Sequence, residues 1–224
     1  MSTYTLPKEL HAAYAAILSE ELVPAMGCTE PIALAYAAAI LAEVLGQAPD
    51  ALDAAVSGNI IKNVKSVVVP MTGGLRGIEV ALAAGLLSAQ PKMKLEVLRV
   101  LGADAKARIG EIMEACAIGV RELDTPHAFD LLLEGKSGEH VCRVRITGFH
   151  TNVTEVTLDG RDLTARYAQS DCAAHTDGDS RTDRSLLTVE NIVTYAEECD
   201  LAPLRPILLR QIEMNTAIAE EGLL

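Results

Sequence analysis

Cys28 has the clearest capacity for chemistry in this sequence, within the segment Met26-Gly27-Cys28-Thr29-Glu30-Pro31. A helix is predicted to begin near Thr29, because threonine is a good N-cap and proline is tolerated in the first turn. The unpaired N–H groups and the dipole of a helix start favour negative charge and therefore lower the pKa of a thiol. We expect a thiolate that can act as a nucleophile or a metal ligand. A buried, inert cysteine is the alternative.

Asn59, Lys62 and Asn63 are three polar residues at helical spacing within the otherwise apolar, β-branched segment 57–70. Polar groups placed among apolar ones cost free energy unless they are bonded. Amides and an ammonium are the partners that a substrate carboxylate requires. The pattern therefore predicts a carboxylate-binding site, and the alternative is a solvent-facing stripe whose apolar neighbours point inward.

A glycine turn, Thr72-Gly73-Gly74, lies between a strand-like apolar run and a helix predicted over residues 78–87. Backbone N–H groups in such a turn can bind an anion. The turn matches neither the P-loop nor the dinucleotide fingerprint, so an ordinary tight turn is the alternative. Taken alone, the turn is better interpreted as an ordinary tight turn than as an anion site.

His150-Thr151-Asn152 stands at the junction of two predicted strands. A histidine has a pKa near neutrality, which suits proton transfer, so His150 is a candidate catalytic residue and Asn152 a candidate substrate contact. The alternative is a histidine whose ring is satisfied by the backbone at a strand end. A cysteine protease is disfavoured, because no histidine of the sequence stands in a diagnostic motif.

The apolar periodicity predicts an α+β fold, in which an Ala-rich helical domain carries a small antiparallel sheet module packed with helices. Residues 8–23 repeat apolar side chains at helical steps, whereas the period changes to two between residues 120 and 163. We expect a helical region over 1–92, an α+β module over 93–165, and an acidic loop with closing helices over 166–224.

Composition excludes several classes of function. The net charge of −12 and the 3% aromatic content argue against nucleic-acid binding, which needs cationic and stacking side chains. The longest apolar run, residues 31–42, is too short to span a membrane. The first residues lack the features of a signal peptide, and the five cysteines show no paired spacing. A cytoplasmic protein is expected.

Four segments, in this order, resemble one family: Gly27-Cys28-Thr29-Glu30-Pro31, Ser57-x-Asn59-x-x-Lys62-Asn63, Pro70-x-Thr72-Gly73 and His150-Thr151-Asn152. They look like the N-terminal half of the L-cysteine desulfidases, which are similar to the iron–sulfur L-serine dehydratase α chains. The resemblance implies a lyase of cysteine catabolism that needs no PLP and converts L-cysteine to sulfide, ammonia and pyruvate. It further implies an oxygen-sensitive [4Fe-4S] cluster held by three cysteines.

Under this resemblance Cys28 matches one cluster ligand, and the other ligands belong to a C-terminal half or to a partner chain. The expected catalytic residues are Lys62 and His150, and the expected substrate contacts are Asn59, Lys62, Asn63, Thr72, Gly73 and Asn152. L-serine dehydratase activity is one alternative, and a non-catalytic amino-acid-binding or structural subunit without the cluster is another. We expect a homo-oligomer or a complex with a chain that carries the C-terminal half.

Overall fold

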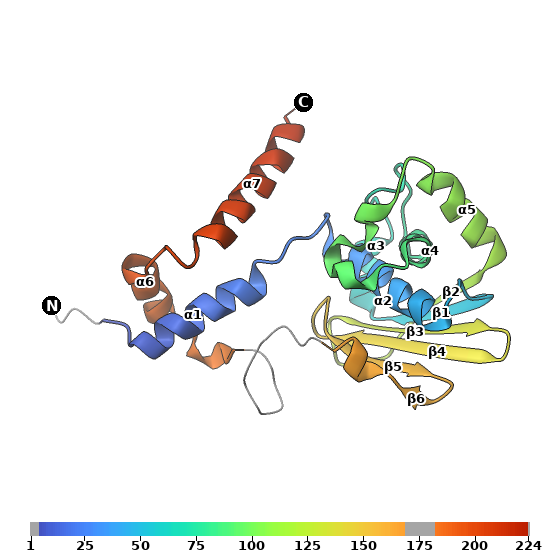
Figure 1. Ribbon diagram of the computed structural model, residues 1–224, viewed down its shortest axis with the longest axis horizontal. Helices are drawn as coiled ribbons and strands as arrows, with labels where there is room; N and C mark the ends of the chain where they lie inside the picture. Colours follow the sequence, from blue (N-terminus) through green and yellow to red (C-terminus); the bar gives the residue numbers. More distant parts are fainter. Residues whose placement is uncertain (1–4, 169–181, 224) are drawn as a thin grey trace. The chain divides into compact units, whose positions relative to one another are not determined.

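The computed structural model describes residues 5–168 and 182–223 (Figure 1). The chain divides into two compact units. The sheet unit covers residues 25–171, and the helical unit combines residues 1–24 with residues 172–224. Within the described ranges, no helix has both the length and the apolar character needed to cross a membrane.

The sheet unit contains one six-stranded sheet of order β2-β1-β3-β4-β5-β6. β1 pairs with β2 in parallel, and every other neighbouring pair is antiparallel. Helices and strands together confirm the predicted α+β class, although the sheet is mixed and larger than expected. Its elements are α2 (Thr29–Leu45), β1 (Ala51–Val56), α3 (Gly58–Val64), α4 (Ile78–Ser88), the 3-10 helix η1 (Pro91–Val100), α5 (Ala105–Ala115), β2 (Ala117–Glu122), β3 (Asp130–Ser137), β4 (His140–Thr147), β5 (Val153–Leu158), β6 (Arg161–Asp162) and the short 3-10 helix η2 (Thr164–Arg166).

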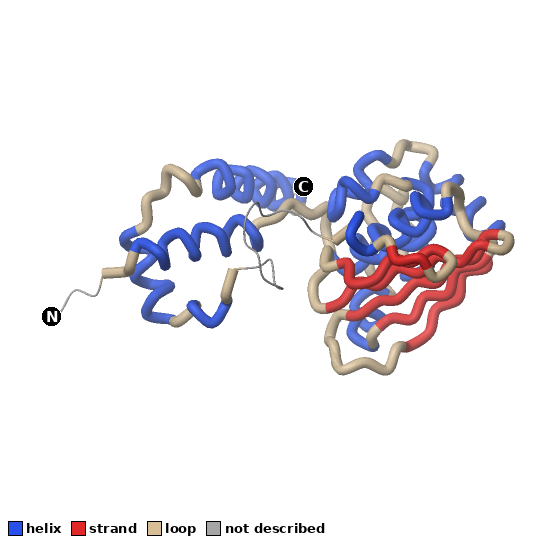
Figure 2. The backbone as a smooth tube through the Cα atoms, turned by 60° about the horizontal axis from the view of Figure 1, so that its bottom comes forward, coloured by secondary structure: helices blue, strands red, loops and turns tan. Residues whose placement is uncertain are grey.

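Helix α2 lies at the centre of the core. Every residue from Pro31 to Ala42 is buried, because α2 packs on the sheet on one side and on α4 on another. Figure 2 shows helices of this unit packed against the sheet. Small side chains make this close packing possible: a Cβ built on Gly85 of α4 would lie 2.6 Å from the Cα of Ala35 in α2. The helix ends at Gly46, whose positive φ of 75° suits glycine.

The opposite face of the sheet is charged. Buried and half-buried residues alternate along β3 and β4, and Arg143 lies between Glu134 and Glu155 at 3.8 and 3.7 Å. An antiparallel sheet commonly packs one face on the core and exposes the other to water. The predicted alternation over residues 120–163 is therefore found in β3, β4 and β5.

Helix α3 differs from the expected structure of residues 57–70, which were predicted to be strand-like. The preceding segment, β1, takes the strand position between β2 and β3. Ile60 and Val64, four residues apart, then become the buried face of a short helix. Consequently the polar residues of α3 lie on its exposed face.

The helical unit consists of α1 (Lys8–Glu21), a 3-10 turn η3 (Arg184–Leu186), α6 (Val189–Glu198) and α7 (Arg205–Glu221). Its core is small: among the described residues, Leu6, Tyr14, Tyr195 and Leu204 form one buried hydrophobic cluster, and Ile17 of α1 is also buried. The predicted helix at residues 8–23 corresponds to α1, and the closing helices predicted within residues 166–224 correspond to α6 and α7. Most of the predicted acidic loop lies outside the described residues.

Candidate functional site

Three segments of the sheet unit meet at the start of α2. The first residues of α2, the exposed face of α3 and the loop after β4 contribute Cys28, Glu30, Asn63 and His150. We call these four residues the thiol cluster. Asn63 contacts Glu30 directly, and His150 lies near enough to Glu30 for the two charges to interact. Residues from three of the four segments that carried the predicted site are therefore brought together.

Glu30 is the centre of the thiol cluster. Its Oε2 accepts hydrogen bonds from Cys28 Sγ at 3.1 Å and Thr29 Oγ1 at 3.4 Å, and its Oε1 accepts one from Asn63 Nδ2 at 3.0 Å. Burial disfavours the charged form of Glu30, but the hydrogen bonds from Cys28, the backbone and Asn63 outweigh it and lower the pKa of the carboxyl. Glu30 is therefore a carboxylate at neutral pH.

Cys28 is exposed and lies at the start of α2 as predicted, but it is itself the N-cap residue, whereas Thr29 was predicted to be the cap. The direction in which the pKa of its thiol is shifted differs from the expectation. Loss of solvation at the sulfur and the hydrogen bond to Glu30 raise the pKa of the Cys28 thiol above its usual value. Burial and the neighbouring carboxylate together outweigh the helix start, and the predicted lowering of this pKa is wrong.

His150 is half-buried, and its ring is tilted against Phe129 with 4.4 Å between ring centroids. Its Nε2 is buried and has no hydrogen-bond partner among the described residues. Burial lowers the pKa of the imidazole, and the nearby Glu30 opposes this only in part. His150 is therefore a neutral base at pH 7 with a free ring nitrogen, which is an uncommon state for a buried polar atom.

Asn59, Lys62 and Asn63 are all exposed on α3. Asn63 belongs to the thiol cluster, whereas Asn59, one turn earlier, lines a neighbouring cavity of about 630 Å³. The cavity is formed by residues 57–59 and 122–128, at the ends of the parallel strands β1 and β2. Ligands of open α/β sheets often bind at the carboxyl ends of parallel strands, so this edge is suited to a small molecule.

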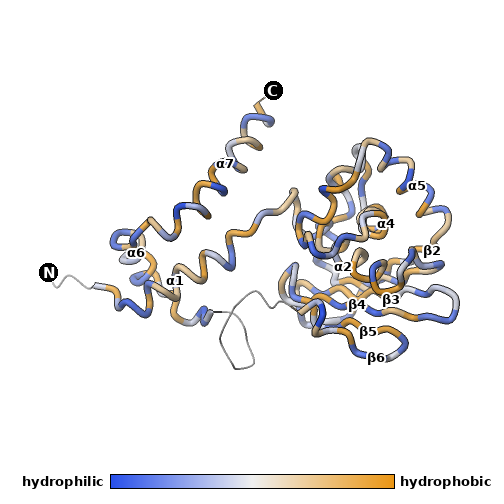
Figure 3. Tube along the Cα trace, in the orientation of Figure 1, coloured by the Kyte–Doolittle hydropathy of each residue, from blue (hydrophilic) through white to orange (hydrophobic). Residues whose placement is uncertain are grey.

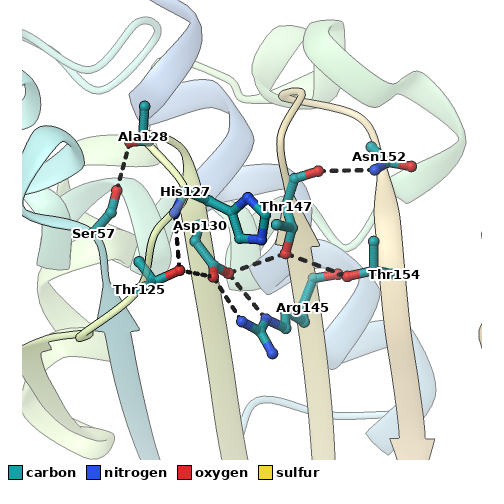
Figure 4. A network of polar contacts seen from close by, with 9 residues as sticks. All are labelled: Ser57, Thr125, His127, Ala128, Asp130, Arg145, Thr147, Asn152 and Thr154. Atoms are coloured by element: carbon teal, nitrogen blue, oxygen red, sulfur yellow. Dashed lines mark hydrogen bonds and ion pairs between the residues drawn. The ribbon is translucent and has the colours of Figure 1, made fainter.

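The loop that forms one wall of this cavity is anchored by Asp130 (Figure 4). Thr125 Oγ1 donates to Asp130 Oδ2 at 2.8 Å, and Arg145 donates from Nε and Nη2 at 3.0 and 2.7 Å. Ser57 Oγ donates to the carbonyl of Ala128 at 2.9 Å. Burial opposes ionisation of Asp130, but Arg145 and two threonine hydroxyls lower its pKa. The wall is thus held rigidly.

Thr72, Gly73 and Asn152 lie in turns. The Thr72 hydroxyl is fully buried and donates to the carbonyls of Val69 and Leu75 within its own loop. Gly73 adopts a φ of 68°, which favours glycine. Asn152 Nδ2 donates to the Thr147 carbonyl at 2.8 Å. These contacts stabilise the turns themselves, and a substrate contact by Thr72 would require its hydroxyl to leave them.

Cys28 is the accessible thiol at this edge. Cys116 and Cys142 are buried, and burial raises the pKa of both thiols, that of Cys142 to about 12. Cys199 belongs to the helical unit, and Cys172 lies outside the described residues. Across residues 5–168 and 182–223 no group of three or more His, Cys, Asp or Glu side chains could hold a metal ion.

Glu30 and Asp130 were not singled out from the sequence. Glu30 stands within the Gly27–Pro31 segment, two residues after the cysteine, so its spacing at a helix start was a usable signal. Asp130 gave no such signal in the sequence. Its partners Thr125, Arg145 and Thr147 meet only when β3 and β4 pair.

Replacing Glu30 with glutamine is expected to increase the reactivity of Cys28. The change removes a negative charge 3.1 Å from the sulfur while keeping the size of the side chain. The thiolate fraction at pH 7.5 should rise by roughly three- to tenfold. The rate of iodoacetamide alkylation at Cys28, followed against pH by mass spectrometry, measures this change. Unchanged kinetics would show that Glu30 does not control the thiol.

No family model matches the chain. It is similar to UPF0597 proteins of Lachnoclostridium phytofermentans (42% identity over 207 residues), Desulfitobacterium hafniense strain Y51 (40% over 210) and Treponema denticola (35% over 219). These matches cover 92%, 94% and 98% of this chain but 48%, 48% and 50% of the relatives. The chain therefore spans about half the length of these curated relatives.

The comparisons correct the resemblance drawn from the sequence. The three relatives are named UPF0597 proteins, and none of the three names refers to a cysteine desulfidase or a serine dehydratase. The prediction that the chain belongs to the L-cysteine desulfidase family is therefore wrong. What the chain does must be argued from its own side chains.

Proposed function

We propose that this chain forms part of the active site of a lyase that removes the β-substituent of a small amino acid, with L-cysteine as the substrate and L-serine as the alternative. The observation that carries the proposal is His150, a neutral imidazole with a buried, unpartnered Nε2 beside the Glu30 carboxylate. Such a base can take the Cα proton with which a β-elimination begins. The exposed polar groups around it are of the kind that an amino acid requires.

The reaction needs one base and one leaving group. The His150 imidazole accepts the Cα proton, the electrons of that C–H bond form the Cα–Cβ double bond, and the Cβ–S bond breaks with its electrons on the departing hydrosulfide. Water then hydrolyses the enamine, after tautomerisation, to pyruvate and ammonia. With L-serine the Cβ–O bond breaks, and the departing hydroxide takes the proton from the His150 imidazolium and leaves as water. His150 is neutral at the start because burial lowers its pKa.

The same surface offers complementary charges for a zwitterionic amino acid. Glu30 is ionised and can accept hydrogen bonds from the substrate ammonium. Lys62 and Asn63, on the exposed face of α3, can bind the carboxylate. This assignment retains the predicted carboxylate-binding role for α3 and adds Glu30 for the opposite end of the substrate.

A [4Fe-4S] cluster remains part of the proposal, with Cys28 as one ligand. The fit rests on the exposure of Cys28 at the N-cap of α2, where a thiol can be reached by a metal. The other ligands would come from another polypeptide or from the further length that the relatives possess. When bound, an open iron supplies a Lewis acid for the leaving group or the carboxylate. We place the protein in the reducing cytoplasm, which agrees with the free thiols of Cys28, Cys116, Cys142 and Cys199.

L-cysteine binding to the whole chain tests this proposal. Calorimetric titration at pH 7.5 should show saturable binding that weakens about tenfold in Asn63→Ala and in Lys62→Met, because each loses a contact to the carboxylate. His140→Gln, which alters an exposed histidine on β4, is the control and should bind normally. Absence of binding to the unaltered chain would contradict the proposal.

Reconstitution with iron distinguishes a lyase component from the alternative, an amino-acid-binding subunit without a cluster. After anaerobic reconstitution with iron and sulfide, a lyase component should acquire charge-transfer absorbance that depends on Cys28. A chain that binds L-cysteine but stays colourless would be an amino-acid-binding subunit instead. Pyruvate and sulfide formed in equal amounts from L-cysteine would identify the elimination itself.

A further inference from the structure

The cavity of about 630 Å³ at the ends of β1 and β2 takes no part in the proposed reaction. The residues that form it, 57–59 and 122–128, all belong to the sheet unit, so its shape does not depend on the helical unit. Glu122, the last residue of β2, pairs with Val56, the last residue of β1, and both strands therefore end beside the cavity. Small-molecule sites commonly measure about 300–1,000 Å³, so an organic molecule has room here.

The lining of this cavity combines negative charge with apolar surface. Its charged side chains are the carboxylates of Glu122 and Asp124, and no lysine or arginine lines it. Within residues 5–168 and 182–223, neither carboxylate has a hydrogen bond or an ion pair to another side chain. Leu123 and Pro126 add apolar contacts, as hydrophobic and hydrophilic residues are also mixed along the neighbouring strands β3 and β4 (Figure 3). These groups suit a cation that also carries carbon atoms.

An organic cation fits this lining better than a metal ion does. His127 lines the cavity together with Glu122 and Asp124, but no group of three or more His, Cys, Asp or Glu side chains among the described residues could hold a metal ion. An ammonium group does not require such convergence, because it is a compact charge whose donors can reach separate acceptors. The carbon chain of an amine can also pack on the apolar part of the lining.

Gly58 leaves room for one of the two carboxylates. A Cβ built on Gly58 would lie 2.8 Å from Oε1 of Glu122. The φ of Gly58 is not positive, so its backbone conformation does not require glycine, whereas the position of the Glu122 carboxylate does. The loop that follows Glu122 is fixed by the hydrogen bond from Thr125 Oγ1 to Asp130 Oδ2 (Figure 4). The cavity is therefore formed before any ligand enters it.

We propose that this cavity binds a small organic amine, whose ammonium group is held by the carboxylates of Glu122 and Asp124. Asn59 supplies an amide that can accept a further hydrogen bond from the ligand, and the carbon chain contacts Leu123 and Pro126. An anion is repelled by the same two carboxylates. The inference is independent of the proposed function, because no residue of the thiol cluster lines this cavity.

Titration of the whole chain with 1,4-diaminobutane tests the proposal. In protein labelled with nitrogen-15 at histidine, the probe should shift the signals of His127, which lines the cavity, saturably and at millimolar concentration at pH 7.5. The signals of His140, an exposed histidine on β4, should move much less. 1,4-Butanediol has the same carbon chain without the charges and should bind at least about tenfold more weakly. Equal binding of the two probes, or equal shifts of the two histidines, would overturn the proposal.

Three variants locate the amine at the two carboxylates. Glu122→Gln and Asp124→Asn should each weaken the binding of 1,4-diaminobutane by roughly three- to tenfold, since each removes one charge. Gly58→Ala keeps both charges, but its Cβ displaces the Glu122 carboxylate, so it should weaken binding to a similar extent. Glu139→Gln, in the turn between β3 and β4, is the matched control and should bind normally. Circular dichroism checks that each variant is folded, and full affinity in any of the first three would overturn the proposal.

Discussion

Replacing Gly85 with alanine is expected to destabilise the sheet unit by about 3 kcal/mol or more. A Cβ at this position would overlap the backbone of Ala35, lying 2.6 Å from its Cα and 2.7 Å from its carbonyl carbon. Backbone atoms cannot rotate away as a side-chain tip can, so α2 and α4 must move apart. Because α2 is buried along most of its length, that displacement loosens the whole core. Urea denaturation followed by far-UV circular dichroism measures the loss.

Gly110 provides the matched control for this prediction. It also lies inside a helix, α5, but a Cβ there would meet nothing within 4 Å. Gly110→Ala should therefore leave the free energy of unfolding unchanged or raise it by up to about 1 kcal/mol, through helix propensity alone. Equal effects of the two substitutions would show that α2 and α4 are not in close contact.

Asp130→Ala is expected to cost about 2 to 3 kcal/mol of folding stability. The carboxylate is fully buried and bonded to Arg145, Thr125 and Thr147, so its removal leaves several donors without an acceptor. Arg145 keeps about a third of its side chain in water, and this reduces the cost below that of a fully buried ion pair. The exposed pair of Asp53 and Arg121 is the control, where Asp53→Ala should cost less than about 1 kcal/mol.

The contribution of Asp130 should depend on pH with a defined sign. Its pKa is lowered in the folded protein, so the unfolded chain binds the proton more readily. The stabilisation is therefore fully present above about pH 4, the pKa of an unfolded aspartate, and is lost as pH falls through the lower folded value. Denaturation curves of the unaltered protein and of Asp130→Ala should converge below pH 4. A difference that stays constant with pH would contradict this account of the network.

The sequence predicted those elements whose pattern is local. Helix α2 follows from its early proline, its alanine-rich apolar run and the glycine at its end, although its N-cap is Cys28 and not the predicted Thr29. Strands β3 to β5 follow from their alternation. Strand β1 was missed because Ala51–Val56 is rich in alanine, which has a weak strand propensity, and is a strand because β2 and β3 pair with it. The pairing partners lie more than 60 residues away, so no local pattern could show them.

The candidate site was predictable as a set of segments but not as a set of contacts. The sequence correctly pointed to Cys28 at a helix start, yet the direction of its pKa shift is set by burial of the sulfur and by the carboxylate of Glu30. Thr72 is a different case, since the hydroxyl of a residue next to a glycine turn can make its hydrogen bonds within its own loop. Asn63 and His150 meet Glu30 only in the folded sheet unit.

The most direct test of the proposed site is the ring nitrogen signal of His150 during addition of L-cysteine. In protein labelled with nitrogen-15 at histidine, the free chain at pH 7.5 should show a neutral His150 ring, because burial lowers its pKa. L-cysteine should shift the His150 resonances, leave those of His140 in place, and lose this effect in Asn63→Ala. His150 signals that stay unchanged while L-cysteine reaches saturation elsewhere would contradict the assignment of this imidazole as the base.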